Sequence, residues 1–449
     1  MSRAAEGPVT DWVRRTGRRA GIALHRRFSA DGVTIEQIAP PPAIPEQLLA
    51  LLRNLGVAMC EAGDAADRVT VILDDVAHAY AATGVRFFVL PTGVFVSIAD
   101  GPRSRVDFAP SSNRTLRLDQ IDELYRIVDD IRHHQLDVEG AATRLRAMHA
   151  SRPRFGPVLT VVATAVLTAG LGLMLNPTAV ALPAYVVLGL LVGSLRWFAG
   201  RHPALEPVLP VVTAGVVTWV CFQFSGLVDS RPLDIVIPAL VTFLPGAALT
   251  MATIELSGGS MISGASRLVY GLERLLFLSF GIATGVALAG LPGSDETVGH
   301  PLGAWAPWVG VLVFAVGQYV ASPAPRRSLL WLLVVLYVAY ATQTIAGTAL
   351  GSLGGSLVAA AVVLPAAYAV QARPSGPPVM VTFLPAFWLL VPGALGLQGV
   401  TELVGADSAA GLGDFINALM SVAAIAVGVQ LGAGWSERVG RTTGVWRGI

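Results

Sequence analysis

The sequence predicts a mostly α-helical membrane protein of about ten transmembrane helices, built as an inverted repeat of five plus five after a small cytoplasmic α+β domain. Only 14% of the 449 residues are charged, against about 25% in soluble domains, and the mean hydropathy is +0.63. The charged residues concentrate before residue 155 and become sparse after it. A motif in the apolar part occurs twice at a fixed distance. Composition therefore divides the chain into a polar N-terminal part and a membrane part.

Residues 1–45 are predicted to be a basic tail followed by a proline-rich linker. Arginines run through residues 11–28 without a continuous apolar core, so a signal peptide is not expected. Two structures stay open for this tail. One is a basic amphipathic helix that inserts Trp12, Ile22 and Phe28 into lipid, and the other is a disordered tail. The stretch APPPAIP that follows favours an extended linker, because proline runs stiffen the chain.

Residues 46–154 are predicted to form the α+β domain. Apolar residues at helical spacing predict four helices, over residues 45–63, 64–84, 115–137 and 138–150. Gly63 and Gly84 are the expected stops of the first two. The stretches VRFFVL and GVFVSIAD are rich in β-branched and aromatic residues, and the Pro-Thr-Gly that joins them predicts a hairpin.

No catalytic or metal site is predicted in this domain. A group of carboxylates could suggest acid–base chemistry, but acidic residues on exposed helix faces are commonplace: Glu61, Asp64, Asp67, Asp74 and Asp75. The histidines lack the spacing of metal ligands and are expected on a solvated face: His133, His134 and His149. Cys60 and Cys221 are expected to be buried apolar residues. We therefore expect no enzyme activity, cofactor or metal, and the net charge of +1 argues against a nucleic-acid partner.

Ten apolar segments follow, each near the roughly 20 residues that cross a hydrocarbon layer of about 30 Å. Their predicted bounds are 156–176, 179–199, 207–227, 233–254, 265–290, 303–321, 328–347, 350–371, 379–401 and 413–434. The first five make up residues 155–290, the second five make up residues 291–435, and residues 436–449 form a C-terminal tail. The short connection GTALGS between the seventh and eighth segments leaves a count of nine open.

Arginines gather in alternate connections, between the second and third, the sixth and seventh, and the eighth and ninth segments, and after the tenth. The other connections are acidic or uncharged. By the positive-inside rule this bias predicts a multi-pass protein of the plasma (inner) membrane with both termini in the cytoplasm.

The repeated motif supports two halves. LPGAALTMATIELSGG begins at Leu244, and VPGALGLQGVTELVGA begins at Val391, 147 residues later. The starts of corresponding apolar segments differ by nearly the same number. Since five is odd, the second half must enter the membrane from the opposite side, which is the inverted repeat of many secondary transporters.

The Pro-Gly pairs predict a break in the fourth and ninth helices, because proline removes an amide donor and glycine loosens the backbone. Breaks at membrane depth in corresponding helices indicate a substrate site, although two packing kinks without a ligand are the alternative. The predicted substrate-binding residues are Thr242, Pro245, Gly246, Thr250, Pro392, Gly393 and Asn417. Thr253 and Thr382 are also polar residues near the breaks. The threonine hydroxyls could instead bond to the carbonyls of their own helices, as threonine often does.

Ionisable residues in the membrane part are few, and such residues are functional candidates because burying them is costly. The candidates for proton coupling are Glu255, Glu273, Glu402 and Asp414. Glu255 is the first choice, and its repeat partner Glu402 would serve the other side; both could instead be solvated helix ends. Arg267 and Arg274 are candidates for charge pairs. Glu255 and Arg267 are expected in the loop between the fourth and fifth segments, and Arg267 and Asp414 occupy equivalent positions of the two halves.

The stretches GVAMCEAGDAADRV and LPGAALTMATIELSGGSMISGASRL, together with LVPG at Leu390–Gly393, resemble the threonine/serine exporter family. The resemblance covers about residues 46–435. It implies an antiporter-like secondary transporter that exports threonine and serine, driven by the proton gradient, with substrate, protons and the lipid bilayer as its partners. A homo-oligomer stays open. The alternatives are a transporter of another small polar metabolite, or a membrane-anchored sensor or enzyme that acts through the N-terminal domain.

Overall fold

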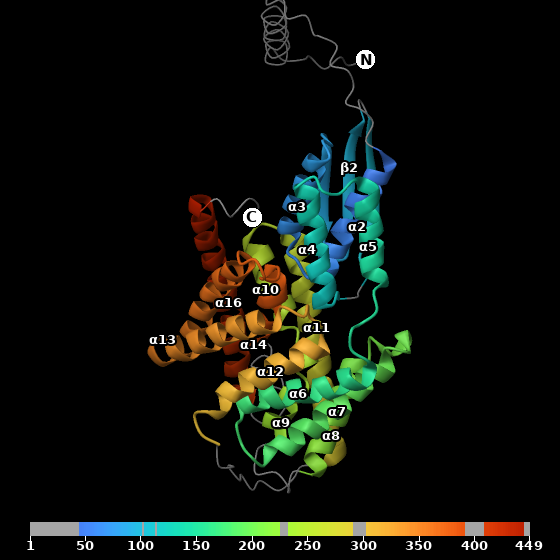
Figure 1. The fold of residues 1–449 in the computed structure, drawn as a ribbon. Helices are drawn as coiled ribbons and strands as arrows, with labels where there is room; N and C mark the ends of the chain where they lie inside the picture. The colour runs from blue at the N-terminus through green and yellow to red at the C-terminus, as the bar shows by residue number, and fades with distance from the viewer. Residues whose placement is uncertain are drawn as a thin grey trace, which may run out of the picture. The chain divides into compact units, whose positions relative to one another are not determined.

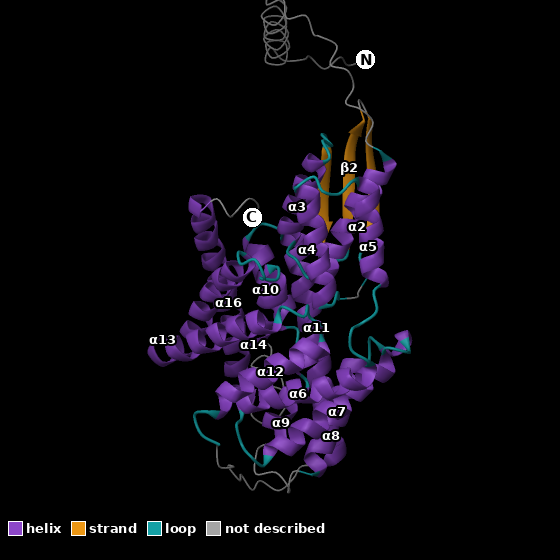
Figure 2. Cartoon of the chain, in the orientation of Figure 1, coloured by secondary structure: helices purple, strands orange, loops and turns teal. Residues whose placement is uncertain are grey.

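A computed structural model describes residues 45–100, 103–112, 115–224, 232–290, 302–390 and 408–443 (Figure 1). The predicted basic tail and nearly all of its linker lie outside these residues. So do the second Pro-Gly pair, Pro392–Gly393, and Glu402. Helices dominate the described part, and the three strands form one small sheet (Figure 2).

The N-terminal domain, residues 46–150, contains the helices and the hairpin that the sequence predicts. Its elements are α2 (Glu46–Glu61), α3 (Ala66–Ala79), β1 (Val85–Leu90), β2 (Gly93–Asp100), β3 (Arg103–Pro110), α4 (Leu118–Arg132) and α5 (Val138–Ala150). Gly63 and Gly84 follow the first two helices with φ of +85° and +83°, a conformation that costs glycine little. The expected helix stops are therefore present at both positions.

The sheet has the order β1-β2-β3, with β1 and β2 antiparallel and Val89 opposite Val94. The third strand was not predicted, because its sequence RSRVDFAP mixes arginines with an alternating apolar pattern of only two residues. The buried residues of the strands face a core of helix residues such as Leu52, Leu73 and Leu124, all of which are fully buried. This core packs α2, α3 and α4 together with the buried residues of β1 and β2.

Every predicted apolar segment overlaps a helix. The helices are α6 (Pro157–Leu175), α7 (Ala181–Ala199), α8 (Leu209–Gln223), α9 (Pro232–Ala239), α10 (Gly246–Ser257), α11 (Met261–Ala289), α12 (Ala306–Ala321), α13 (Leu329–Gln371), α14 (Val379–Leu389) and α16 (Ser408–Thr443). Two short 3-10 helices, η1 (Pro203–Leu205) and η3 (Val241–Phe243), lie between them.

Five of the described helices have the length and composition to span a membrane, or six if the bent pair α9–α10 is one span. Three shorter apolar helices, α8, α12 and α14, lie where the third, sixth and ninth segments were predicted. The seventh and eighth segments are merged in the 43-residue α13, which is interrupted at Gly351, where φ is +75° and ψ is 176°. A glycine tolerates this backbone conformation, and it breaks the helix within the predicted connection.

Helices α6 and α12 pack together through glycines. A Cβ atom added to Gly170 of α6 would overlap the backbone nitrogen of Phe314, and one added to Gly317 of α12 would overlap that of Leu167. Further toward the C-terminus of α6, Met174 contacts Gly310, which lies nearer to the N-terminus of α12. The two helices are therefore antiparallel, and small residues allow their backbones to approach closely.

Candidate functional site

The first predicted break is present in the structure. The helix pair Pro232–Ala239 and Val241–Ser257 is bent by 53°. Leu244 has an extended backbone, with φ −66° and ψ 128°, and Pro245 precedes the first residue of α10, Gly246. Proline cannot donate the amide hydrogen bond that would continue the helix, so α10 starts afresh at this point.

The broken helix contains a second proline that the sequence analysis missed. Pro238 lies inside α9, and Pro385 lies inside α14, 147 residues later. Each is followed by alanine and, after five further residues, by Pro-Gly. The repeated motif is therefore longer than the one first recognised, and a wider comparison of the two halves would have found it.

The threonines near the break fall into two groups. Thr253 donates its hydroxyl to the carbonyl of Leu249 at 3.1 Å, and Thr382 donates to Val379 at 3.3 Å. These two follow the alternative interpretation, in which the hydroxyl bonds its own helix. The hydroxyl oxygens of Thr242 and Thr250 are shielded from solvent and have no hydrogen-bond partner among the described residues. Buried hydroxyls without partners are costly. The hydroxyls of Thr168, Thr213 and Thr218, outside the broken helix, are in the same state, so the position of Thr242 and Thr250 beside the break is what distinguishes them.

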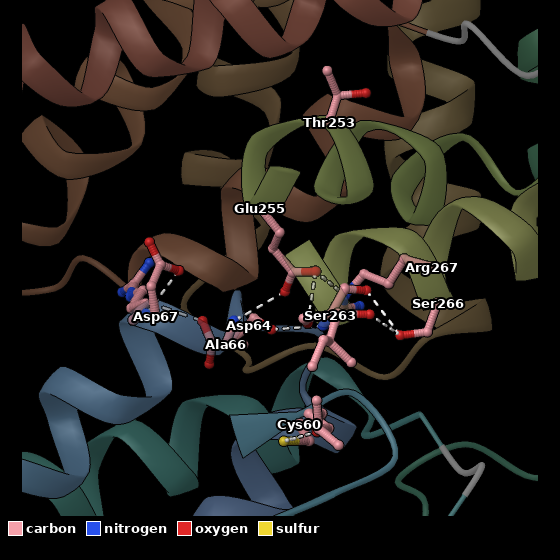
Figure 3. Close-up of polar contacts among 12 residues, drawn as sticks. Cys60, Asp64, Ala66, Asp67, Thr253, Glu255, Ser263, Ser266 and Arg267 are labelled. Carbon is pink, nitrogen blue, oxygen red and sulfur yellow. Dashed lines mark hydrogen bonds and ion pairs between the residues drawn. The ribbon is translucent and has the colours of Figure 1, made fainter. Parts of the chain in front are cut away.

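Glu255, at the C-terminal end of α10, lies at the centre of a buried polar cluster (Figure 3). It is 1% exposed. Its Oε1 accepts the backbone N–H of Ala66 at 3.0 Å, and its Oε2 accepts the hydroxyl of Ser263 at 2.8 Å. The Nε of Arg267 lies 3.1 Å from the same Oε2. The alternative of a solvated helix end therefore does not hold for Glu255, because donors from two elements, α3 and α11, enclose its carboxylate.

Arg267 joins this cluster to the N-terminal domain. Its Nη2 donates to the backbone carbonyl of Asp64 at 2.9 Å, while its Nε is bound to Glu255. Both residues lie in helices, Glu255 in α10 and Arg267 in α11, and not in a loop as expected. The helices extend further than the hydropathy pattern because Gly258–Gly259–Ser260 alone makes the turn between them.

Asp64 itself is buried, 1% exposed, and both of its carboxylate oxygens accept the hydroxyl of Tyr125 at 2.7 Å. Arg68 lies 3.8 Å from the same carboxylate. Burial raises the pKa of the Asp64 carboxyl, and the charge of Arg68 and the hydrogen bond from Tyr125 oppose this shift. The expected solvated acidic face is therefore wrong for Asp64, and also for Glu61, which is 8% exposed.

The remaining candidates lie apart from this cluster. Glu273 is exposed on α11, and Arg274 donates to the hydroxyl of Tyr270 at 3.1 Å. Asn417 is exposed on α16. Asp414 belongs to the same helix, but its side chain, like Glu402 and Pro392–Gly393, lies outside the described residues. Within the ranges that the structure describes, no group of three or more possible metal ligands occurs.

Helices of spanning length and an apolar composition make this a multi-pass membrane protein. The chain belongs to the threonine/serine exporter family, a family of membrane transporters, because the model of that family, described as "Putative threonine/serine exporter", matches residues 50–289. The match includes the whole cluster around Glu255 and the first break.

Several curated fungal proteins are similar to this chain. Pheromone-regulated membrane protein 10 of Debaryomyces hansenii is 29% identical over 206 residues, 41% of this chain and 20% of that protein. An uncharacterized protein of Schizosaccharomyces pombe is 27% identical over 221 residues, 46% of this chain and 28% of that protein. The chain therefore spans less than a third of the length of these relatives. No solved structure matches the chain.

Proposed function

We propose that the protein is a secondary transporter that exports threonine and serine by alternating access, coupled to the proton gradient. The family supports transport of this kind. The observation that carries the substrate site is the interruption at Leu244–Pro245, within a helix pair that is bent by 53°. On either side of this interruption lie Thr242 and Thr250, whose hydroxyls have no partner among the described residues. An amino acid is the kind of ligand that such a site can bind.

The chemistry of the break suits a zwitterion with a hydroxyl group. The first amides of a helix have no partner within the helix, and its N-terminal end carries a partial positive charge. The start of α10 at Gly246 therefore offers amide donors to a carboxylate. The hydroxyl oxygens of Thr242 and Thr250 can accept a hydrogen bond from the ammonium group of the substrate, or form a hydrogen bond with its hydroxyl group.

The contact between α6 and α12 supports two inverted halves. Gly317 follows Gly170 by 147 residues, and Phe314 follows Leu167 by the same number. Gly170 of α6 contacts Phe314 of α12, and Gly317 of α12 contacts Leu167 of α6. The same contact is thus made in both directions, as a two-fold axis requires. Since the helices are antiparallel, this axis runs across them, so it would lie in the membrane plane. That is the symmetry of transporters that alternate access by rocking two halves.

The arginines of alternate connections support the orientation. Arg201, Arg327 and Arg373 belong to connections that this proposal places on the same side, and the positive-inside rule makes that side the cytoplasm. The N-terminal domain, which joins α6 directly, would then lie in the cytoplasm as well, and the plasma (inner) membrane would be the site of export.

Proton coupling requires a carboxylate whose surroundings change during the cycle. Glu255 is our first candidate, because its carboxylate faces Arg267 and the N-terminal domain in the described state. The ion pair must open before this carboxylate can take up a proton, so a movement of α10 would link protonation to the break. Glu273, Glu402 and Asp414 are the further candidates.

The proposal is tested with the purified full chain in vesicles. Vesicles loaded with labelled threonine, serine or unrelated amino acids should lose the first two fastest when a proton gradient is imposed. Glu255→Gln should abolish the proton-driven part and keep exchange between substrate pools. Release of all amino acids at one rate would reject the substrate assignment. Proton-driven export that survives Glu255→Gln would reject Glu255 as the coupling residue.

A further inference from the structure

The N-terminal domain contacts both proposed membrane halves, at two separate places. The first contact is the turn before α3, where the backbone of Asp64 and Ala66 meets Arg267 and Glu255 of the first half. Both of these hydrogen bonds are made with backbone groups of the turn. A mobile surface loop would not hold such bonds, so the turn must be fixed by its own domain.

The second contact is the start of α4. The backbone N–H of Asp119 donates to the carbonyl of Pro323 at 2.8 Å, and Nη2 of Arg327 lies 3.2 Å from Oδ1 of Asp122. Pro323 and Arg327 belong to the connection between α12 and α13, in the second half. Asp122 is 4% exposed, and Arg126 of its own helix binds its other oxygen at 2.6 Å.

The two contacts resemble each other physically. Each combines a buried carboxylate, Glu255 or Asp122, with an arginine of the membrane part and a backbone amide at a helix start of the domain. Release of the domain at the first contact leaves Oε1 of Glu255 without the Ala66 amide and Nη2 of Arg267 without the Asp64 carbonyl. Release at the second contact leaves the buried carboxylate of Asp122 with Arg126 alone. Loss of hydrogen bonds by buried charged groups is costly, so each contact can serve as a latch.

The domain connects the two latches rigidly. The side chain of Asp64, whose backbone belongs to the first latch, is bonded to the hydroxyl of Tyr125 on α4. Asp122 of the second latch lies three residues before Tyr125, on the same helix. Bonded groups thus run from Arg267 through Asp64 and α4 to Arg327. A displacement at one latch must be carried to the other, because packed cores deform little.

We propose that the N-terminal domain is a clamp that holds the two membrane halves in one relative position, and that the first latch, at α10, must open in each transport cycle. This inference rests on the proposed two-half transporter. Rocking of the halves changes the distance between α10 and the α12–α13 connection, and a rigid body attached to both resists that change. The C-terminal end of α10 carries one latch and its N-terminal end begins at the break, so release of the latch frees the helix that would bind substrate.

A reversible cross-link tests the clamp. In a full-length background with Cys60→Ala and Cys221→Ala, the pair Asp67→Cys and Gly258→Cys bridges the latch at α10, because a Cβ atom on Gly258 would lie 3.8 Å from the Asp67 carboxylate. The pair is joined by a short bis-thiosulfonate reagent. We expect the cross-link to reduce threonine efflux at least about tenfold, as a locked equilibrium would, and a reductant to restore it. The single-cysteine variants treated with the same reagent are the controls. Efflux that is equal before and after the cross-link would overturn the clamp.

A second measurement does not depend on the substrate. Ser263, 2% exposed, lies beneath the first latch, and Ser263→Cys in the same background reports its opening by the rate of maleimide labelling. Arg327→Ala, at the distant latch, should raise this rate by about fivefold, the change expected from a partly exposed ion pair. Arg327→Lys should restore most of the protection, and Arg326→Ala is the control of equal charge.

Equal labelling of Ser263→Cys in the Arg327→Ala and Arg326→Ala variants would overturn the connection between the latches. The labelling result also separates the two proposals. If neither the wild type nor any variant transports threonine, the proposed substrate is wrong. The clamp is still supported if the labelling rate of Ser263→Cys rises in the Arg327→Ala variant.

Discussion

Gly281 and Gly428 stand 147 residues apart and meet the same three kinds of atoms in the same order. A Cβ atom on Gly281 would face the carbonyl oxygen of Val211, then the Cβ of Ala214 and a backbone nitrogen. On Gly428 it would face the carbonyl oxygen of Leu357, then the Cβ of Ala360 and a backbone nitrogen. The crossing of α11 with α8 is therefore repeated in the crossing of α16 with α13.

This relationship predicts matched losses of stability. Gly281→Ala and Gly428→Ala should each lower the thermal stability of the purified protein by a similar amount, on the order of 1–3 kcal/mol, because the added methyl forces the helices apart. Gly434→Ala is the control, since a Cβ there has no atom within 4 Å. A large loss at one glycine with none at the other would contradict equivalent crossings.

The break is tested by filling it. Gly246→Leu adds a bulky helix former where α10 starts, and we expect export to be lost while the protein still reaches the membrane. The same substitution at Gly434, in the open, should leave export near the wild-type rate. If Gly246→Leu exports normally, the break is a packing kink and the substrate lies elsewhere.

Thr250 and Thr253 form a matched pair one helical turn apart. Thr250→Val removes a hydroxyl that has no partner among the described residues, so it should raise the KM for threonine about three- to tenfold, the value of one hydrogen bond. Thr253→Val removes a hydroxyl that is bonded to its own helix and should change the KM by less than about twofold. Equal effects of both variants would exclude Thr250 as a substrate ligand.

The orientation is tested with single cysteines and an impermeant thiol reagent. Ala179→Cys, in the exposed connection of α6 and α7, should react from outside intact cells, and Ser375→Cys, between α13 and α14, should react only after the cells are opened. Labelling of Ser375→Cys in intact cells would reject the inverted repeat. The connection that contains Arg373 would then face the outside, and not the cytoplasmic side on which the proposal places it.

Cys60 provides a test of the domain core that needs no substitution. Burial raises the pKa of its thiol from 9.0 to about 12, and its Sγ donates to the carbonyl of Leu90 at 3.4 Å. At pH 8 only about one thiol in ten thousand is then ionised, so labelling should require unfolding.

The sign of the linkage follows from the same shift. The folded state holds the Cys60 proton more tightly, so this contribution to stability is present below pH 9 and is lost as the pH rises toward 12. Fast labelling of Cys60 in the folded protein at pH 8 would show that the thiol is not enclosed.

Local signals in the sequence predicted much of the fold and little of the latch. Gly63, Gly84 and the β1–β2 hairpin depend on neighbouring residues, and the structure contains them as expected. The burial of Glu255 depends on Ala66, which is 189 residues away. No periodicity reports such a contact, and a carboxylate near the end of an apolar helix has the same pattern whether water or another domain covers it. The proposed two-half arrangement would depend on distant contacts as well, but the glycines and prolines repeated at 147 residues are visible in the sequence.

The close contact of α6 with α12 has a consequence for biosynthesis. About 130 residues separate the two helices, so a ribosome that adds roughly 5–20 residues per second needs on the order of 10 s to reach α12 after it completes α6. During this time the glycine face of α6 around Gly170 has no partner in its own chain. The insertion machinery, or lipid, must occupy that face until the second half arrives. Truncated chains that end before residue 300 should therefore be retained by the insertase or degraded, even though they contain the first five apolar segments.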